Sequence, residues 1–211
     1  MQPDDTRASY DSIASHWASD AFHAENGMEQ HRRALQFLNR QEANSTTTAL
    51  DVGCGSSGRL IELLIETGFE VEGLDISTEM LALAPSRHPN ITFHQADFCE
   101  WSFPRQYDFI TAWDSVWHIP LARQGETISK LCGGLTAGGV LIFSAGGTDE
   151  PDEVTNDCHG ARSTMPRWGF RTSCACWTNP IASAATWNTI SGRKCMSTSL
   201  SRSATSYHGG R

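Results

Sequence analysis

Ala49-Leu50-Asp51-Val52-Gly53-Cys54-Gly55-Ser56-Ser57-Gly58-Arg59-Leu60 is the stretch that decides how this chain folds. A short apolar run ends in an acidic residue and breaks into the pattern Gly-x-Gly-x-x-Gly, after which Leu60, Leu63 and Leu64 follow at helical spacing. The pattern predicts a strand, a tight glycine turn and a helix. Such a turn lets a ligand approach bare backbone at the positive end of a helix, where free N–H groups can hold a carboxylate or a phosphate.

The length and charge of the chain exclude several classes of protein. Its 211 residues suit one α/β domain with a substantial core. The formal net charge of −8 gives no reason to expect nucleic acid or an anionic membrane surface as a partner. Residues 1–6 lack the basic and apolar regions of a secretory signal, and no apolar run approaches the ~20 residues of a membrane span. We therefore expect a cytoplasmic enzyme. The expected oligomeric state is a monomer or a homodimer.

Strands and helices are expected to alternate along most of the chain. Residues 8–40 carry apolar and aromatic side chains at helical spacing and predict two helices with a break near Asn26-Gly27. The predicted strands are roughly 48–52, 69–75, 91–97, 107–113 and 140–145. The predicted helices between them are roughly 58–66, from the N-cap Ser77 to a stop at Pro85, and 121–131. This order predicts a Rossmann-like three-layer α/β/α fold with N-terminal helices and a mostly parallel sheet.

Acidic residues fall at the ends of the predicted strands, where open parallel sheets bind their ligands. Asp75 lies 22 residues after Gly53, the distance at which an acid can accept hydrogen bonds from ribose hydroxyls. Asp51 would repel a pyrophosphate but attract an ammonium or sulfonium group. Asp97 could accept a hydrogen bond from the exocyclic amine of adenine, with Phe98 beside the ring. The acids therefore favour an adenosine that carries a positive charge.

These residues resemble the class I S-adenosylmethionine-dependent methyltransferases. Residues 51–58 look like the first motif of that family, 74–77 like the second and 96–98 like the third. Residues 107–110 resemble the fourth motif, and 135–139 the usual turn before strand five. The resemblance covers about residues 8–150. It implies S-adenosyl-L-methionine as the cofactor and methyl transfer to a small molecule as the reaction.

The resemblance also implies roles for single residues. The glycine turn would pack against the methionine part of the cofactor, Asp75 would bind the ribose, and Asp97 with Phe98 would bind the adenine. The predicted cofactor-binding set is Asp51, Gly53, Cys54, Gly55, Asp75, Ile76, Met80, Asp97, Phe98 and Trp113. A sulfonium is already a strong methyl donor, so alignment and exclusion of water can suffice and a protein base is optional. The candidates for such a base are His118, Asp114 and Tyr10.

Other interpretations stay open at this point. The glycine pattern also fits a nicotinamide-dependent oxidoreductase, although Asp51 and the lack of a Tyr-x-x-x-Lys pair oppose it. A non-catalytic protein that keeps the nucleoside pocket is a third class. Asp51 could instead cap a turn, Asp97 could be an ordinary loop acid, and His118 could serve packing or the start of a helix. Cys158, His159 and the later cysteines lack zinc-site spacing, so no metal is expected.

The last quarter of the sequence differs from the rest. All 24 acidic residues precede Cys158, and from there to Arg211 no helical or strand period appears. We interpret 158–211 as a tail translated in a shifted reading frame. Under such a shift the codons of Met165-Pro166 must give Ala and those of Trp187-Asn188 must give Glu. The alternative is a natural divergent or disordered tail.

A shifted frame has consequences for the fold. The family's C-terminal antiparallel strands would be missing or degraded, and the strand at 140–143 would be left as a bare edge. We therefore expect a helical cap at 1–47, a cofactor-binding Rossmann-like domain at 48–150 and an irregular tail at 158–211. The cofactor pocket would persist while methyl transfer would be impaired.

Overall fold

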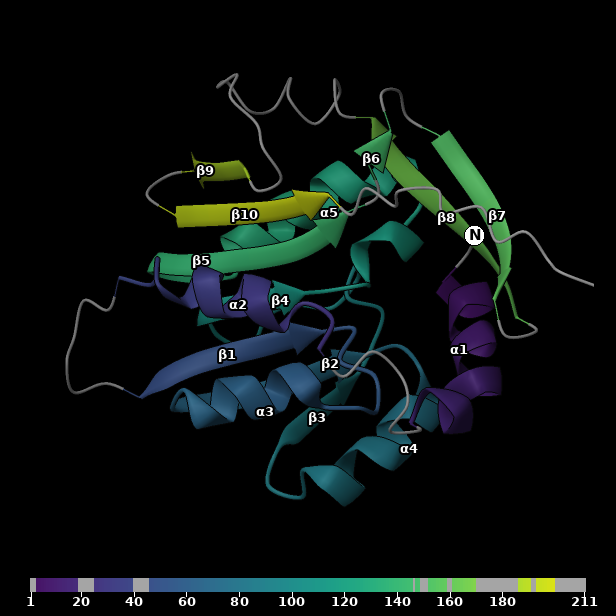
Figure 1. Cartoon of the computed structure of the whole chain (residues 1–211), viewed down its shortest axis with the longest axis horizontal. Coiled ribbons are helices and arrows are strands. Elements are labelled where there is room, and N and C mark those ends of the chain that lie inside the picture. Colours follow the sequence, from purple (N-terminus) through teal and green to yellow (C-terminus); the bar gives the residue numbers. More distant parts are fainter. Residues whose placement is uncertain are drawn as a thin grey trace, which may run out of the picture.

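The computed structural model describes residues 3–18, 25–39, 46–145, 147–148, 152–158, 161–169, 186–190 and 193–199. Its main sheet has the order β3-β2-β1-β4-β5-β10-β9 (Figure 1). The strands of this sheet are β1 (Thr47–Val52), β2 (Phe69–Asp75), β3 (Thr92–Gln95), β4 (Tyr107–Ala112), β5 (Leu135–Ala145), β9 (Thr186–Ile190) and β10 (Arg193–Ser199). Strands β3, β2, β1, β4 and β5 are parallel, which confirms the predicted Rossmann-like fold.

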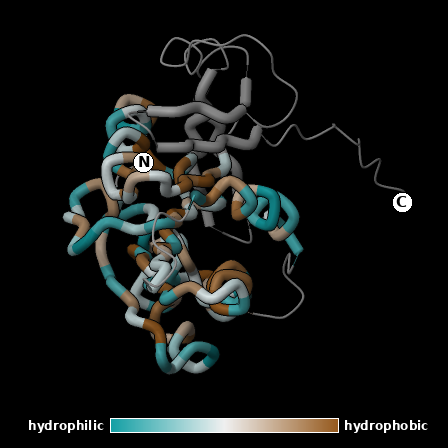
Figure 2. The backbone as a smooth tube through the Cα atoms, turned by 90° about the vertical axis from the view of Figure 1, so that its left-hand side faces the viewer, coloured by the Kyte–Doolittle hydropathy of each residue, from teal (hydrophilic) through white to brown (hydrophobic). Residues whose placement is uncertain are grey.

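Helices cover both faces of the sheet. They are α1 (Pro3–Trp17), α2 (Met28–Leu35), α3 (Arg59–Glu66), α4 (Thr78–Arg87) and α5 (Leu121–Gly133), with a short 3-10 helix η1 (Val116–His118). On one face, Ala34 of α2 and Leu64 of α3 join a cluster with Phe109 and Val140 of the sheet. On the other face, α5 packs its Leu131 into a second cluster. Figure 2 traces these apolar segments through the interior of the described chain.

The strand order reverses between β1 and β4. Strand β1 pairs with β2 on one side and with β4 on the other, and both pairs are parallel. The connections leaving β1 and β4 therefore run to opposite sides of the sheet and leave a crevice at the carboxyl ends of the strands. Helix α1 lies beyond these ends (Figure 1). This arrangement positions the candidate site.

Two predicted boundaries differ from the structure. Helix α4 does not stop at Pro85 but continues to Arg87. Proline removes only its own N–H donor, so the residues after it still bond to the preceding turn, as the contact of 3.1 Å between the N–H of His88 and the carbonyl of Ala84 shows. Strand β5 starts at Leu135, within the stretch interpreted as a turn.

The C-terminal part also differs from the prediction. Strands β9 and β10 fall within the segment expected to be irregular, and they pair with each other in antiparallel fashion. Strand β10 runs parallel to β5 and covers the edge at 140–145, so the expected bare edge is wrong. Strand pairing uses backbone N–H and C=O groups, which a segment without hydrophobic alternation supplies equally well. The prediction that these strands are missing is therefore incorrect for residues 186–190 and 193–199.

A second, smaller sheet follows β5. It has the order β6-β8-β7, formed by β6 (Gly147–Thr148), β7 (Asp152–Cys158) and β8 (Ala161–Gly169). Strand β8 contacts α1 and η1, so this sheet stands next to the crevice.

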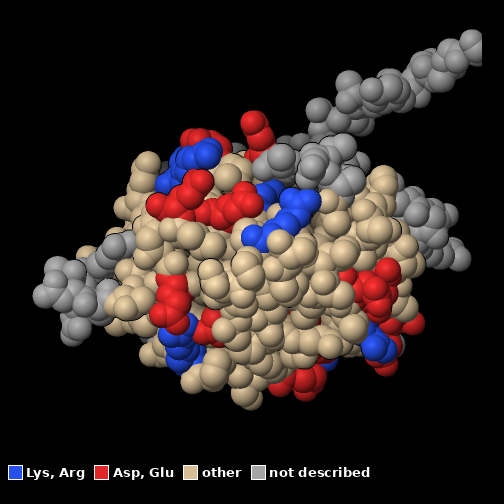
Figure 3. All heavy atoms as spheres, turned by 90° about the horizontal axis from the view of Figure 1, so that it is seen from below, with Lys and Arg blue, Asp and Glu red and all other residues tan. Residues whose placement is uncertain are grey.

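Within the described ranges, no helix combines the length and apolar character needed to cross a membrane. The face seen in Figure 3 carries acidic and basic side chains close together.

Candidate functional site

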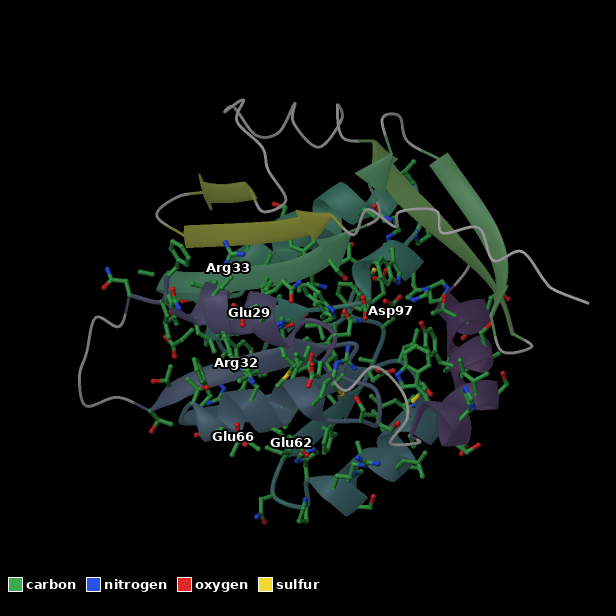
Figure 4. The ribbon with its side chains drawn as sticks, in the orientation of Figure 1. Glu29, Arg32, Arg33, Glu62, Glu66 and Asp97 are labelled. Carbon is green, nitrogen blue, oxygen red and sulfur yellow. The ribbon has the colours of Figure 1, made fainter. Side chains whose placement is uncertain are left out.

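A pocket opens at the carboxyl ends of the strands. It holds about 1060 Å³ of open space and is walled by α1, the glycine turn after β1 and the segments that follow β2, β3 and β4. All ten residues of the predicted cofactor-binding set line it, and so do the three base candidates. Figure 4 shows Asp97 at the strand ends, on the side that faces α1, while Glu62 and Glu66 lie on α3 away from it. The structure thus brings the whole predicted constellation together.

The glycine turn needs its first glycine for two reasons. Gly53 has a positive φ of 73°, a region that side chains rarely adopt. A Cβ atom there would also lie 2.5 Å from the Cβ of Ser115, in the loop after β4. The N–H groups of Gly53 and Cys54 both donate to the carbonyl of Leu74, at 2.7 and 3.2 Å. These bonds fold the turn onto β2 and leave the backbone bare on the pocket side.

Asp75 is held in one orientation by the backbone. Its Oδ2 accepts a hydrogen bond from the N–H of Gly55 and its Oδ1 one from the N–H of Ser77, both at 2.8 Å. Burial raises the pKa of Asp75, and the bonds from Ser77 and Gly55 counteract that rise. Each oxygen keeps a lone pair for a further donor, which is what a pair of ribose hydroxyls requires.

Asp51 is a buried carboxyl group beside the glycine turn. It is 3% exposed, and among the described residues no N–H or O–H group donates a hydrogen bond to it. The described residues therefore give the interpretation of Asp51 as a turn cap no supporting hydrogen bond. Burial raises the pKa of Asp51 to about 7, the guanidinium of Arg59 opposes this rise and the carboxyl of Asp75 adds to it. Such a group suits a positively charged ligand that supplies the missing partner.

Asp97 fits both interpretations made from the sequence, as an acid of the loop after β3 and as a residue of the pocket. Its Oδ1 accepts a hydrogen bond of 2.9 Å from the N–H of Cys99, and its carbonyl accepts from the N–H groups of Glu100 and Trp101. The residue therefore does cap the loop after β3, as an ordinary loop acid would. The same carboxyl group lines the pocket next to Phe98.

The base candidates are already engaged with protein groups. The indole N–H of Trp117 donates to Nε2 of His118 at 3.0 Å, and the hydroxyl of Tyr10 lies 2.6 Å from the same nitrogen. Because an indole can only donate, this Nε2 carries no proton. Burial lowers the pKa of His118 to about 4, so the ring is neutral at pH 7 and a weak proton acceptor.

Asp114 ties several segments together. Its backbone has a positive φ of 57°, which is unusual outside glycine and is often found at functional sites. Its Oδ2 accepts a hydrogen bond of 2.8 Å from the side-chain amide of Asn26, and its Oδ1 one of 3.2 Å from the hydroxyl of Ser144. Asp114 thus joins the segment before α2 to the end of β5, which gives it an organising role at the pocket wall.

Several lining residues were not in the predicted set. Arg59 and Ser115 are neighbours of predicted residues in the sequence, so adjacency to the motifs could have indicated them. Trp17 lines the pocket from the far end of α1. Asp11 accepts hydrogen bonds from the hydroxyl of Ser77 at 2.6 Å and from the N–H of Glu79 at 3.2 Å. Asp11 thereby fastens α1 to the start of α4. No local sequence pattern predicts this contact.

Comparisons with known proteins show which families and structures this chain is similar to. A family model described as "Methyltransferase domain" matches residues 49–139, which hold the glycine turn and the strand ends. The dTDP-3-amino-3,6-dideoxy-alpha-D-glucopyranose N,N-dimethyltransferase of Streptomyces fradiae is 36% identical over 115 residues, which cover 53% of this chain and 44% of that protein. The trans-aconitate 2-methyltransferase of Acidovorax ebreus is 30% identical over 159 residues, covering 74% and 56%. The chain spans about half the length of these curated relatives.

Solved structures share the fold. The DhpI-SAH complex superposes with a TM-score of 0.60 at 21% identity and covers 89% of this chain and 90% of its own. CalS10, an amino pentose methyltransferase from Micromonospora echinaspora solved with bound SAM, gives a TM-score of 0.56 at 17% identity, with coverages of 87% and 93%. Both likenesses concern the fold.

The third glycine of the turn generates a prediction about packing. A Cβ on Gly58 would lie 1.9 Å from Nε2 of His88, and Gly58 has a positive φ of 67°. We expect Gly58→Ala to lower the free energy of unfolding by about 2–4 kcal/mol, through the clash and the backbone strain together. In a His88→Ala background only the strain remains, and the loss should fall to about 1 kcal/mol. Urea unfolding of the four proteins measures both values.

Gly68→Ala is the matched control for this cycle. Gly68 also has a positive φ, of 91°, but a Cβ there meets nothing within 4 Å. Its substitution should cost about 1 kcal/mol whether or not His88 is present. If Gly58→Ala lowered the free energy of unfolding equally in both backgrounds, contact with the imidazole of His88 would not be the reason for a glycine at this position.

Proposed function

We propose that this chain, whose residues 49–139 match the model of a methyltransferase domain, is a class I S-adenosylmethionine-dependent methyltransferase that transfers a methyl group from that cofactor to a small-molecule acceptor. The observation that carries the proposal is the grouping of Asp51, the glycine turn, Asp75 and Asp97 around one pocket. S-Adenosylmethionine supplies an electrophilic methyl group on a sulfonium. The chain's own residues then have to bind the cofactor, orient the acceptor toward the methyl group and shield the reacting groups from water.

The pocket fits this cofactor on its own evidence. Asp75 presents two oriented oxygens to the ribose, and Asp97 with Phe98 presents an acceptor and a ring to the adenine. Asp51 lacks a donor from the described protein and is suited to the ammonium of the methionine part. Tyr10 and Trp17 of α1 line the same pocket, where they would shield the reacting groups from water.

The chemistry of the acceptor side favours an amine as the nucleophile. A hydroxyl acceptor needs a base, and His118 is a weak one with its basic nitrogen already hydrogen-bonded. Asp51 and Asp114 line the pocket together with Arg59 and Arg123, so charge alone does not decide against a carboxylate acceptor. A neutral amine attacks through its own lone pair and can release its proton to solvent afterwards. The Streptomyces fradiae relative is named for an N,N-dimethylation of an amino sugar, which supports this choice.

The tail remains part of the proposal. We keep the interpretation that residues 158–211 are read in a shifted frame, supported by the lack of any acidic residue there. Activity would then be weak although the cofactor binds. The cytoplasmic location and the monomeric or homodimeric state also remain predictions.

Calorimetric titration tests the function directly. S-Adenosylhomocysteine should bind with a Kd of about 1–100 µM, whereas NADH should show no binding at the same concentrations. Binding of NADH alone would favour the oxidoreductase alternative. If S-adenosylhomocysteine binds but labelled methyl groups reach no acceptor in a panel of amines, alcohols and carboxylates, the non-catalytic alternative is the better one.

Asp51 makes cofactor affinity depend on pH. Because its pKa is raised to about 7, it is largely protonated below that pH and ionised above it. Only the ionised form attracts the ammonium of S-adenosylhomocysteine, so affinity should rise about 10-fold between about pH 6 and about pH 8. Asp51→Asn should bind weakly with a flat profile. The matched ligand 5′-methylthioadenosine has no ammonium, and a similar pH rise for that ligand would contradict this role of Asp51.

The shifted frame is tested by sequencing the coding DNA. Reading from the region of Cys158 in the adjacent frame should give an open sequence that includes acidic residues and an alternating apolar strand. Stop codons in that frame, or a product without strand and helix periods, would make the tail a natural divergent one.

A further inference from the structure

The two ring nitrogens of His118 are unequally satisfied. Nε2 accepts the indole N–H of Trp117 at 3.0 Å and lies 2.6 Å from the hydroxyl of Tyr10. Nδ1 is buried and, among the residues that the structure describes, has no hydrogen-bond partner. Because an indole can only donate, Nε2 has to accept, and the proton of the neutral ring is on Nδ1. One nitrogen therefore meets two polar groups, while the N–H on the other nitrogen meets none.

The contact with Trp117 confines His118 to this one protonation state. A proton on Nε2 would point at the indole N–H, so two donors would face each other. Burial also lowers the pKa of His118 to about 4, which keeps the ring neutral near neutral pH. The Nδ1–H group is therefore a fixed donor and not one of two interchanging forms.

The loop after β4 holds further unpaired polar groups. Nε1 of Trp113 and the hydroxyl of Ser115 are buried, and within the described part of the chain neither has a hydrogen-bond partner. Both residues line the pocket, as His118 does. Buried donors are rarely left unpaired unless water or a ligand completes them. Their clustering between residues 113 and 118 indicates a ligand that brings oxygen acceptors to this wall.

His118 stands apart from the groups assigned to the cofactor. It belongs to η1, and its ring packs edge-on against that of Tyr10 on α1, with centroids 5.1 Å apart and planes at 86°. The ribose and the adenine are assigned instead to Asp75 and Asp97, at the ends of β2 and β3. The wall that carries His118 is thus left for the methyl acceptor.

We propose that Trp117 is a positioning residue, which fixes the proton of His118 on Nδ1 so that this N–H binds an oxygen atom of the methyl acceptor. The inference rests on the proposed function and narrows its acceptor to an amine with a hydroxyl or ether oxygen close to the nucleophilic nitrogen. His118 then acts as a hydrogen-bond donor and not as a base. An acceptor without the oxygen leaves a buried N–H unpaired, so the site discriminates against it.

A packing role for the pair is the competing explanation. Trp117 and His118 would then only hold α1 in place through Tyr10, and the proton position would not matter. Loss of the indole bond would in that case affect every acceptor alike. A direct measurement of the proton position and a pair of matched acceptors separate the two explanations.

Nitrogen NMR of the full chain labelled in histidine reports which ring nitrogen carries the proton, and His118→Gln assigns the signal. Near neutral pH we expect the proton on Nδ1 of His118. Trp117→Phe keeps an aromatic ring but removes the donor, so the share of the form protonated on Nε2 should rise. Trp101→Phe is the matched control, because Trp101 packs beside a different histidine, His94, whose Nε2 bonds to Glu72. A wild-type proton on Nε2, or no change in Trp117→Phe, would overturn the proposal.

Two amines that differ by one hydroxyl group test the acceptor. With S-adenosylhomocysteine bound, trans-2-aminocyclohexanol should shift the Nδ1 signal of His118, and cyclohexylamine should not. In methyl-transfer assays, Trp117→Phe should lower kcat/KM for the amino alcohol about 10-fold, mainly through KM, and that for cyclohexylamine less than about 3-fold. His118→Asn keeps an amide N–H near the position of Nδ1, so it should retain more of the preference for the amino alcohol than His118→Gln.

Each remaining outcome counts against the proposal or against the function beneath it. Equal losses for both amines in Trp117→Phe would assign the pair to packing. Equal losses in His118→Asn and His118→Gln would restore His118 as a base, since neither amide can accept the proton. If neither amine moves the Nδ1 signal while S-adenosylhomocysteine is bound, the proposal is overturned. If S-adenosylhomocysteine itself does not bind, the proposed function fails, whatever the proton position in the free protein.

Discussion

The structure depends on the way the backbone clamps Asp75. One oxygen of this carboxylate accepts the N–H of Gly55 in the glycine turn, and the other accepts the N–H of Ser77 at the start of α4. Two neighbouring βα units, whose strands β1 and β2 already pair along their length, are thereby also joined through one side chain at the strand ends. The hydroxyl of Ser77 continues the chain of contacts to Asp11 on α1. Turn, second strand, fourth helix and covering helix are aligned by a few hydrogen bonds around a single buried acid.

This arrangement concentrates unfavourable groups in one place. Asp51 and Asp75 are both buried, and each raises the other's cost of ionisation. Asp114 adds a backbone conformation that side chains rarely adopt. Folding tolerates them because the two clusters on either side of the sheet bury enough apolar surface to hold the strand ends in register. Backbone strain and buried charged groups at the ends of well-packed strands lower stability. They are typical of sites that bind a ligand.

Local sequence patterns could predict what local geometry determines. The parallel strands and the acids at their ends follow from periodicity, because a strand that ends in an acid places that acid at the sheet edge. The comparisons confirm this fold. Contacts between distant segments could not be predicted in the same way, because neither the bond of Asp11 to Ser77 nor that of Tyr10 to His118 follows from a periodic pattern. Strand β10 pairs with β5, and strand pairing uses backbone groups that hydrophobic alternation does not predict. The division into cap, domain and tail stays a prediction.

Helix α1 touches both sides of the pocket that it covers. Asp11 fastens it to the start of α4, and Tyr10 meets His118 on the far wall. The two contacts hold α1 at two points, so any movement of this helix away from the pocket has to break one of them first. The two contacts differ in chemistry: one is a carboxylate at the positive end of a helix, the other a pair of neutral rings. The weaker, neutral contact is the one expected to open first. The two ends of α1 are therefore not equivalent: the end beside His118 is expected to separate from the pocket before the end that Asp11 fastens to α4.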